Sequence, residues 1–194
     1  MNKITIIGTG SVGSTIAYTL ANNGIVSDIV MIDVNGFKAE GEALDILTGL
    51  GNGYDLSASG EYPLLVGGGV GTPPLYKLAK ELTAMGKKVT VILGFNTKSE
   101  VFYEKEFEAL GATVKVCTVD GSYGIRGFVT DAMTGVDYTY FYSCGPEPML
   151  KALYKATATS GQFSFEERMG CGFGACMGCS CKTITGYKRI CKEG

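Results

Sequence analysis

Short apolar runs alternate along the chain with longer segments that mix apolar and charged residues. The short runs are rich in β-branched and aromatic residues and predict strands over Ile4–Ile7, Ile29–Ile32, Pro63–Val66, Lys88–Leu93, Thr113–Thr118 and Tyr138–Ser143. The longer segments predict helices over Ser14–Asn22, Pro74–Met85, Glu100–Leu110, Gly127–Met133 and Pro146–Ser160. This alternation predicts an α/β fold, in which a parallel sheet carries helices on both faces.

The first predicted strand leads into a glycine turn with the pattern G-x-G-x-x-G. Gly8, Gly10 and Gly13 form the pattern, and Asp33 ends the next strand, twenty residues after Gly13. This context is typical of a Rossmann-like dinucleotide site, where glycines admit pyrophosphate to a helix N-terminus and the acid accepts hydrogen bonds from ribose hydroxyls. The alternative is a turn of the same sequence that binds nothing.

A second glycine-rich loop follows the strand Pro63–Val66, at the start of the next helix, where a pyrophosphate would dock. A third loop follows the strand that ends at Ser143. Carboxyl ends of parallel strands share one edge of a sheet, where ligands collect, so we expect both loops to face one cleft. The candidate residues are Gly67, Gly68, Gly69, Gly71, Thr72, Pro73, Cys144, Gly145 and Pro146. An ordinary glycine turn and a buried, inert Cys144 are the alternatives.

Four cysteines near the C-terminus have the spacing of a plant-type 2Fe-2S site. Cys171, Cys176 and Cys179 form C-x4-C-x2-C, and Cys191 supplies a distant fourth thiolate. Zinc is the first alternative, although zinc sites favour paired C-x2-C knuckles and only Cys176 and Cys179 form one. Disulfides are the second. Cys181 is expected to pack rather than to ligate iron.

Composition narrows the possible functions. The net charge of −2 provides no electrostatic footprint for nucleic acid or an anionic membrane, and no apolar run approaches the length of a membrane span. Seven cysteines without the pattern of a signal peptide lead us to expect a reducing cytoplasm. The sequence has no histidine, which excludes imidazole catalysis and a Rieske-type cluster.

Three segments in order carry a resemblance to one family. They are Gly-Gly-Gly-Val-Gly-Thr-Pro-Pro-Leu from Gly67, Cys-Gly-Pro-Glu-Pro-Met from Cys144, and the cysteine-rich segment from Glu166 to Cys179. From about residue 48 to residue 194, the chain resembles the electron-transfer subunit of type B dihydroorotate dehydrogenase, within the ferredoxin–NADP reductase superfamily. The resemblance implies NAD(H) at the two loops and a 2Fe-2S cluster on Cys171, Cys176, Cys179 and Cys191.

The same resemblance implies a partner and a flavin. The partner would be the FMN-containing catalytic subunit of dihydroorotate dehydrogenase, a pyrimidine-biosynthesis enzyme. FAD is also implied, yet the Arg-x-Tyr-Ser/Thr motif of the family's flavin-binding barrel has no match in this sequence.

The first 46 or so residues resemble a different family, the bacterial L-lactate and malate dehydrogenases. The match runs to the segment Ala-Glu-Gly-Glu-Ala-Leu-Asp-Ile that ends at Ile46, and the catalytic histidine of such enzymes is missing from the chain. We therefore expect three parts: a dehydrogenase-like nucleotide-binding segment at 1–46, a reductase-type NAD-binding domain at 47–160 and a 2Fe-2S subdomain at 161–194.

The sequence thus favours an oxidoreductase component that relays electrons between a flavoprotein and NAD through an iron–sulfur cluster. One alternative is a non-catalytic iron–sulfur or nucleotide-binding module that lacks its flavin domain. The other is a fragment of a lactate- or malate-type dehydrogenase, which the absence of histidine opposes.

Overall fold

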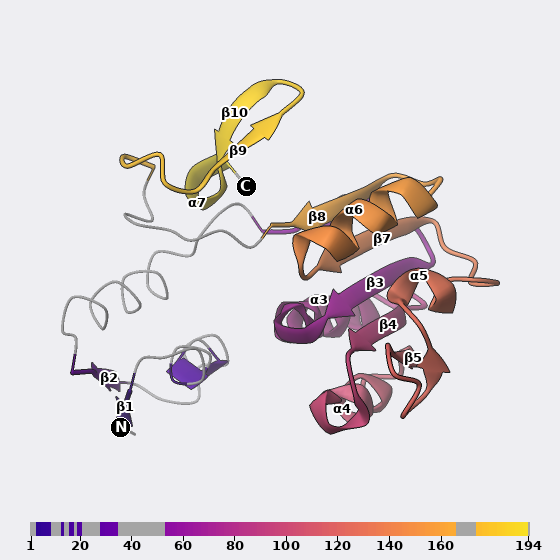
Figure 1. Ribbon diagram of the computed structural model, residues 1–194, viewed down its shortest axis with the longest axis horizontal. Coiled ribbons are helices and arrows are strands. Elements are labelled where there is room, and N and C mark those ends of the chain that lie inside the picture. Colours follow the sequence, from indigo (N-terminus) through magenta and orange to yellow (C-terminus); the bar gives the residue numbers. More distant parts are fainter. Residues whose placement is uncertain are drawn as a thin grey trace. The chain divides into compact units, whose positions relative to one another are not determined.

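The computed structural model describes residues 3–8, 13, 16, 17, 19, 20, 28–34, 53–165 and 174–193. The chain divides into two compact units, one of residues Tyr54–Glu166 and the other of Met1–Gly53 together with Glu167–Gly194. Figure 1 shows their elements.

A six-stranded parallel sheet forms the centre of the unit Tyr54–Glu166, which confirms the predicted α/β class. Its strands lie in the order β6-β5-β4-β3-β7-β8. In chain order they are β3 (Pro63–Gly68), β4 (Thr90–Phe95), β5 (Thr113–Thr118), β6 (Ile125–Arg126), β7 (Tyr140–Cys144) and β8 (Gly161–Ser164). Every residue of β3 is buried, as expected for a central parallel strand covered on both faces.

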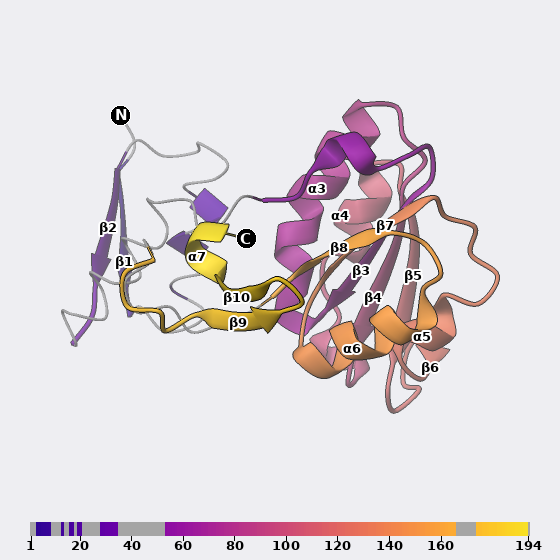
Figure 2. The same cartoon turned by 90° about the horizontal axis from the view of Figure 1, so that it is seen from above.

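Helices cover both faces of this sheet (Figure 2). On one face, α3 (Thr72–Ala84) and α4 (Glu104–Ala109) bury Leu78 and Phe107 against Leu65. On the other face, α5 (Val129–Ala132) and α6 (Glu147–Ala156) bury Val129 and Leu153 against Leu64. Neighbouring residues of one strand point to opposite faces, so a single apolar run in β3 supplies two cores.

Several boundaries differ from the sequence predictions. Helix α3 begins at Thr72 rather than Pro74. Helix α4 begins at Glu104 rather than Glu100, because Lys98–Glu100 is a separate 3-10 turn and Tyr103 adopts a left-handed backbone with φ of 68°. The helix expected to reach Ser160 ends at Ala156, after which Gly161–Ser164 joins the sheet as β8.

In the N-terminal segment, β1 (Lys3–Ile7) and β2 (Asp28–Ile32) pair in parallel as a two-stranded sheet. The predicted strands Ile4–Ile7 and Ile29–Ile32 are therefore confirmed, each one residue longer at its start. Between Gly8 and β2, the described residues are helical, and all but Gly13 fall within the predicted helix Ser14–Asn22; they are Gly13, Ile16, Ala17, Thr19 and Leu20.

The C-terminal segment contains a hairpin that the sequence analysis missed. Strand β9 (Ser180–Thr183) pairs antiparallel with β10 (Gly186–Arg189), and the short helix α7 (Ile190–Glu193) follows directly. The hairpin returns the chain so that Cys191 follows the end of β10, beside the start of β9. Across the described ranges, no helix has the length and apolar character needed to cross a membrane.

Candidate functional site

The two predicted nucleotide loops lie side by side at the carboxyl edge of the six-stranded sheet. Strands β3 and β7 are neighbours, with Val66 opposite Ser143 and Gly67 opposite Cys144. The next turn, Gly69–Gly71, passes so close to β7 that a Cβ atom on Gly71 would stand 2.1 Å from the carbonyl oxygen of Cys144. Only glycine permits this contact without a shift of backbone. The close packing of the two loops therefore requires glycine at position 71.

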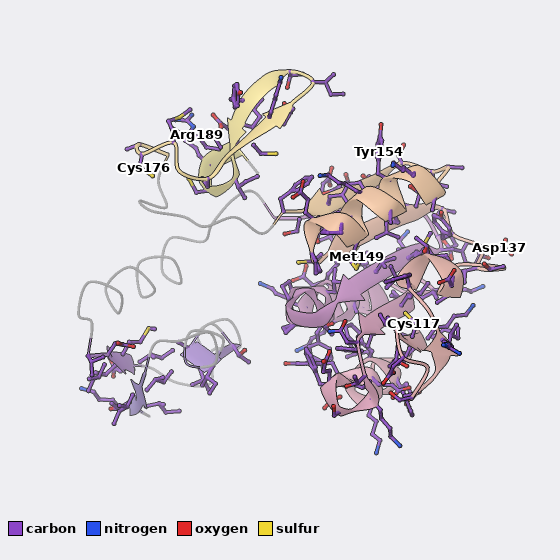
Figure 3. The ribbon with its side chains drawn as sticks, in the orientation of Figure 1. Cys117, Asp137, Met149, Tyr154, Cys176 and Arg189 are labelled. Atoms are coloured by element: carbon purple, nitrogen blue, oxygen red, sulfur yellow. The ribbon has the colours of Figure 1, made fainter. Side chains whose placement is uncertain are left out.

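Met149 of helix α6 fills the space beneath both loops (Figure 3). A Cβ atom on Gly68 would stand 2.6 Å from the Met149 sulfur, and one on Gly145 would stand 2.6 Å from its terminal methyl group. A flexible thioether can occupy such an irregular gap. The floor of the loops is therefore apolar.

Thr72 provides an independent indication of a ligand at this edge. Its side chain is fully buried in the first turn of α3, and its hydroxyl oxygen has no hydrogen-bond partner among the described residues. A buried hydroxyl without a partner costs free energy unless a ligand or water completes it. Backbone N–H groups at a helix N-terminus also attract anions, so the residues present fit a pyrophosphate group.

A network of tyrosines supports the loop after Cys144 and was missed by the sequence analysis. The hydroxyl of Tyr54 donates to the carbonyl oxygen of Ser143 at 2.9 Å, and that of Tyr142 donates to the carbonyl oxygen of Asp55 at 2.9 Å. Burial, with a contribution from Cys144, raises the pKa of Tyr54 far above its ordinary value. Burial likewise raises the pKa of Tyr142 to about 12, so both phenols stay protonated donors.

Two further loops at the same edge are held by polar side chains. After β4, the backbone N–H and side-chain amide of Asn96 both donate to Glu100 at 3.1 Å. After β5, the side chain of Asp120 accepts from the backbone and hydroxyl of Ser122, which lowers the pKa of Asp120. The Ser122 hydroxyl in turn accepts from the backbone of Lys98 at 2.8 Å. These bonds tie the ends of β4 and β5 together.

In the cysteine-rich segment, two of the predicted ligands lie next to each other. Cys179 and Cys191 are both buried, and the backbone N–H of Cys191 donates to the Cys179 sulfur at 3.5 Å. Cys176 is exposed, and the backbone N–H of Gly178 donates to its sulfur at 3.4 Å. Between them, Met177 has a left-handed backbone with φ of 60°, which turns the Gly178 N–H toward the sulfur.

The described residues contain no group of three histidine, cysteine, aspartate or glutamate side chains gathered in a metal-binding geometry. The prediction for Cys171 falls outside the described residues. The chemistry of the remaining donors nevertheless fits an iron–sulfur cluster, because backbone N–H groups directed at thiolate sulfurs stabilise the negative charge of such a cluster.

Arg189 and Glu193 stand beside these cysteines and had not been predicted as functional. The carboxylate of Glu193 raises the pKa of Arg189, and the nearby Cys191 and Cys179 add to this effect. The bonds from Arg189 lower the pKa of Glu193 to about 2. The only sequence signal for this pair was an arginine two residues before the last cysteine.

The N-terminal glycine turn is described in part. Gly8 has a left-handed φ of 92°, its N–H donates to the Ile32 carbonyl at 2.7 Å, and a Cβ atom on Gly13 would stand 1.8 Å from the Gly8 carbonyl oxygen. Gly10 falls outside the described residues, and Asp33 directly follows β2. The tight turn predicted for Gly8 and Gly13 is thus present, while the role of Asp33 stays a prediction.

Family models match three successive segments of the chain. Residues 2–53 match the NAD-binding domain of lactate/malate dehydrogenase, residues 65–155 match an oxidoreductase NAD-binding domain, and residues 166–194 match the iron–sulfur cluster binding domain of dihydroorotate dehydrogenase B. The last two matches make the chain similar to the class of proteins that couples a reductase-type NAD-binding domain to an iron–sulfur domain.

Within this class, the chain is similar to one particular protein. It is 50% identical over 165 residues to the dihydroorotate dehydrogenase B (NAD(+)) electron transfer subunit of a Geobacillus species and to that of Bacillus pumilus. Each alignment covers 81% of this chain and 64% of the relative. The resemblances to this subunit and to the lactate/malate dehydrogenases are therefore both confirmed, and the chain spans about 64% of the length of the relatives it matches.

A solved structure shares the fold. The NADH-dependent reduced ferredoxin–NADP oxidoreductase, described in a study of flavin-based electron bifurcation, aligns with a TM-score of 0.65 at 31% identity. The alignment covers 75% of this chain and 54% of that one. The likeness supports the reductase-type assignment of the α/β unit.

Proposed function

We propose that this chain is an electron-transfer subunit that exchanges electrons between a flavoprotein partner and NAD through a 2Fe-2S cluster. By similarity to its relatives, the partner is the FMN-containing catalytic subunit of dihydroorotate dehydrogenase, which acts in pyrimidine biosynthesis. The observation that supports it most is the succession, in one chain, of two features. One is a nucleotide edge where the buried hydroxyl of Thr72 has no partner among the described residues, and the other is a cysteine-rich segment matching an iron–sulfur domain.

The proposed nucleotide site is the edge formed by β3 and β7. Gly67, Gly68, Gly69 and Gly71 would let the pyrophosphate of NAD(H) approach the backbone, and Thr72 and Pro73 begin the helix whose N-terminus faces it. Cys144, Gly145 and Pro146 would line the nicotinamide end, held by the bond between Tyr54 and Ser143. These residues bind and orient; none of them is proposed to move a proton.

The proposed cluster ligands are Cys171, Cys176, Cys179 and Cys191. When bound, a 2Fe-2S cluster supplies storage for a single electron at a time. Nicotinamide exchanges two electrons as hydride, so a flavin that handles both kinds of transfer is required between the cluster and NAD, and a bound FAD would serve there. The N–H donors from Gly178 and Cys191 would hold the sulfurs of Cys176 and Cys179 in place.

Three further assignments belong to the same proposal. The division at 1–46, 47–160 and 161–194 stays a proposal, as does the cytoplasm as the place of action. The turn with Gly8, Gly10, Gly13 and Asp33 is proposed as a second nucleotide site without chemistry of its own, since the chain has no histidine to serve as the dehydrogenase base.

The proposal is tested by anaerobic reconstitution with iron and sulfide, followed by visible absorbance and EPR of the reduced protein. We expect the absorbance and EPR signal of a 2Fe-2S cluster, and reduction of that cluster when NADH, FAD and the FMN-containing catalytic subunit are all present. A colourless protein that holds zinc would contradict the proposal. A cluster that stays oxidised in the complete mixture would instead favour the non-catalytic module.

A further inference from the structure

Arg189, at the end of β10, is held by an unusually complete set of bonds to one carboxylate. The backbone N–H of Arg189 donates to Glu193 at 2.6 Å, its Nε donates to the same oxygen at 3.2 Å, and its Nη2 donates to the other oxygen. Both side chains are partly sheltered, with 26% and 32% of their surface exposed. A planar guanidinium paired in this way with a carboxylate has a fixed orientation.

The remaining arm of the guanidinium reaches the cysteine loop. Nη1 of Arg189 donates to the carbonyl oxygen of Gly174 at 2.8 Å. Gly174 lies between Cys171 and Cys176 in the sequence and has a left-handed φ of 90°. A Cβ atom there would stand 3.0 Å from the side chain of Lys192 and 3.3 Å from Nη1 of Arg189. The loop therefore runs directly against Lys192 and Arg189, and a side chain at this position would push them aside.

Arg189 also lies close along the hairpin to two of the predicted cluster ligands. Arg189 pairs across the hairpin with Ser180, the residue after Cys179, and lies two residues before Cys191, while Glu193 of α7 binds its guanidinium. Figure 3 shows Arg189 and Cys176 in the same C-terminal segment. A fixed cation beside the ligands of a cluster stabilises the reduced form, because reduction adds a negative charge to the site.

We propose that Arg189, oriented by Glu193, is a positioning residue of the cluster site, which clamps the loop at Gly174 and raises the reduction potential of the bound cluster. This inference rests on the proposed function, since it concerns the cluster that the four cysteines would hold. It adds Arg189 and Glu193 to the cluster site. Their two effects, on the conformation of the loop backbone and on the reduction potential of the cluster, can be measured separately.

Three variants separate these effects. Arg189→Gln removes both the positive charge and the guanidinium group that bonds Glu193 and Gly174. Arg189→Lys keeps the charge but removes the guanidinium group, and Lys182→Gln removes an exposed positive charge of the same hairpin as a matched control. The midpoint potential is measured by EPR-monitored redox titration of the reconstituted protein. Amide hydrogen exchange of residues 175–178 is measured in the metal-free protein.

For Arg189→Gln, we expect an about tenfold shift of the one-electron equilibrium toward the oxidised cluster, which corresponds to a fall of about 59 mV. Arg189→Lys should keep most of the potential, and both Arg189 variants should exchange the loop amides faster than Lys182→Gln does. If Arg189→Gln fails to hold a cluster while Lys182→Gln holds one, the clamp is supported. The midpoint potential is then measured in Arg189→Lys instead.

A potential in Arg189→Gln equal to that of Lys182→Gln would overturn the electrostatic part. Unchanged amide exchange in both Arg189 variants would overturn the clamp. A wild-type chain that assembles no cluster would overturn the proposed function and the effect on potential with it, whereas the exchange comparison would still decide about the clamp.

Discussion

At the nucleotide edge, a single polar side chain indicates where a ligand would bind. Thr72 is the clearest case. Within the part of the chain that the structure describes, its buried hydroxyl has no partner, whereas the hydroxyl of Thr83 on the same helix donates to the Ala79 carbonyl at 2.8 Å. A folded chain tolerates one such unpaired group when a ligand completes it. The two threonines of α3 therefore form a matched pair for experiment. Thr72 is expected to contact the nucleotide, and Thr83 only bonds within the helix.

Thr72→Val should stabilise the nucleotide-free protein while weakening nucleotide binding. The substitution keeps the side-chain shape and removes the unpaired hydroxyl, so we expect a gain of about 1 kcal/mol in the free energy of unfolding. Loss of a hydrogen bond to the ligand should lower NADH affinity about tenfold. Urea denaturation and calorimetric titration measure the two effects.

Thr83→Val is the control and should leave NADH affinity unchanged. An unchanged affinity in Thr72→Val as well would mean that its hydroxyl does not contact the nucleotide.

At the scale of elements, β5 lies between β4 and β6 and contributes to both cores of the sheet. Cys117 of β5 is fully buried, and its thiol donates to the Leu93 carbonyl of β4 at 3.4 Å. Burial, with a contribution from Asp131 of α5, raises the pKa of Cys117 to about 11 from an ordinary 9.0. This thiol is thus a packing group, unlike the predicted cluster ligands.

The raised pKa predicts a specific loss of stability in alkaline solution. The folded state holds the Cys117 proton more tightly than the unfolded state does, so this stabilisation is complete below pH 9 and is lost as the pH rises from 9 to about 11. Cys117→Ala should lose less of its free energy of unfolding across this range than the wild type, as measured by urea denaturation below pH 9 and near pH 11.

Cys181→Ala, which removes a half-buried thiol of β9, should behave like the wild type. Equal losses in the wild type and in Cys117→Ala would show that this thiol does not carry the effect; the other ionising groups, including Tyr142, are common to both proteins.

At the scale of the whole molecule, the two candidate sites belong to different units. The nucleotide edge lies within Tyr54–Glu166, and Cys176, Cys179 and Cys191 lie within the other unit. The six-stranded sheet has two buried helix layers of its own, so its fold does not depend on ligands of the cysteine-rich segment. Loss of one site should therefore leave the other intact.

Cys176→Ser tests this separation. We expect it to abolish assembly of the 2Fe-2S cluster, because a serine oxygen is a poor replacement for a thiolate ligand of iron, while NADH affinity stays within about twofold of the wild type. Cluster content is measured by absorbance and EPR, and NADH affinity by calorimetry. Cys181→Ser, a change of the same kind at a cysteine outside the ligand set, should retain the cluster; joint loss of cluster and NADH affinity in Cys176→Ser would argue against separable sites.

The sequence by itself determined the class of the fold and the place of its loops. The strand Thr113–Thr118 was predicted with its observed bounds, and the loops at Gly67 and Cys144 follow the strands expected to precede them. Apolar periodicity and glycine-rich turns are local signals, and local signals are enough to fix which segments form strands and which edge collects the loops.

Only the tertiary structure decided which residues meet. The approach of Gly71 to the Cys144 carbonyl, the missing partner of Thr72, and the bond from Arg189 to Gly174 each join residues far apart in sequence or depend on their burial. The edge strand β8 was likewise not predicted, because its four residues join the sheet only through their pairing with β7. Such contacts depend on how the chain folds back on itself, and no local pattern of residues encodes them.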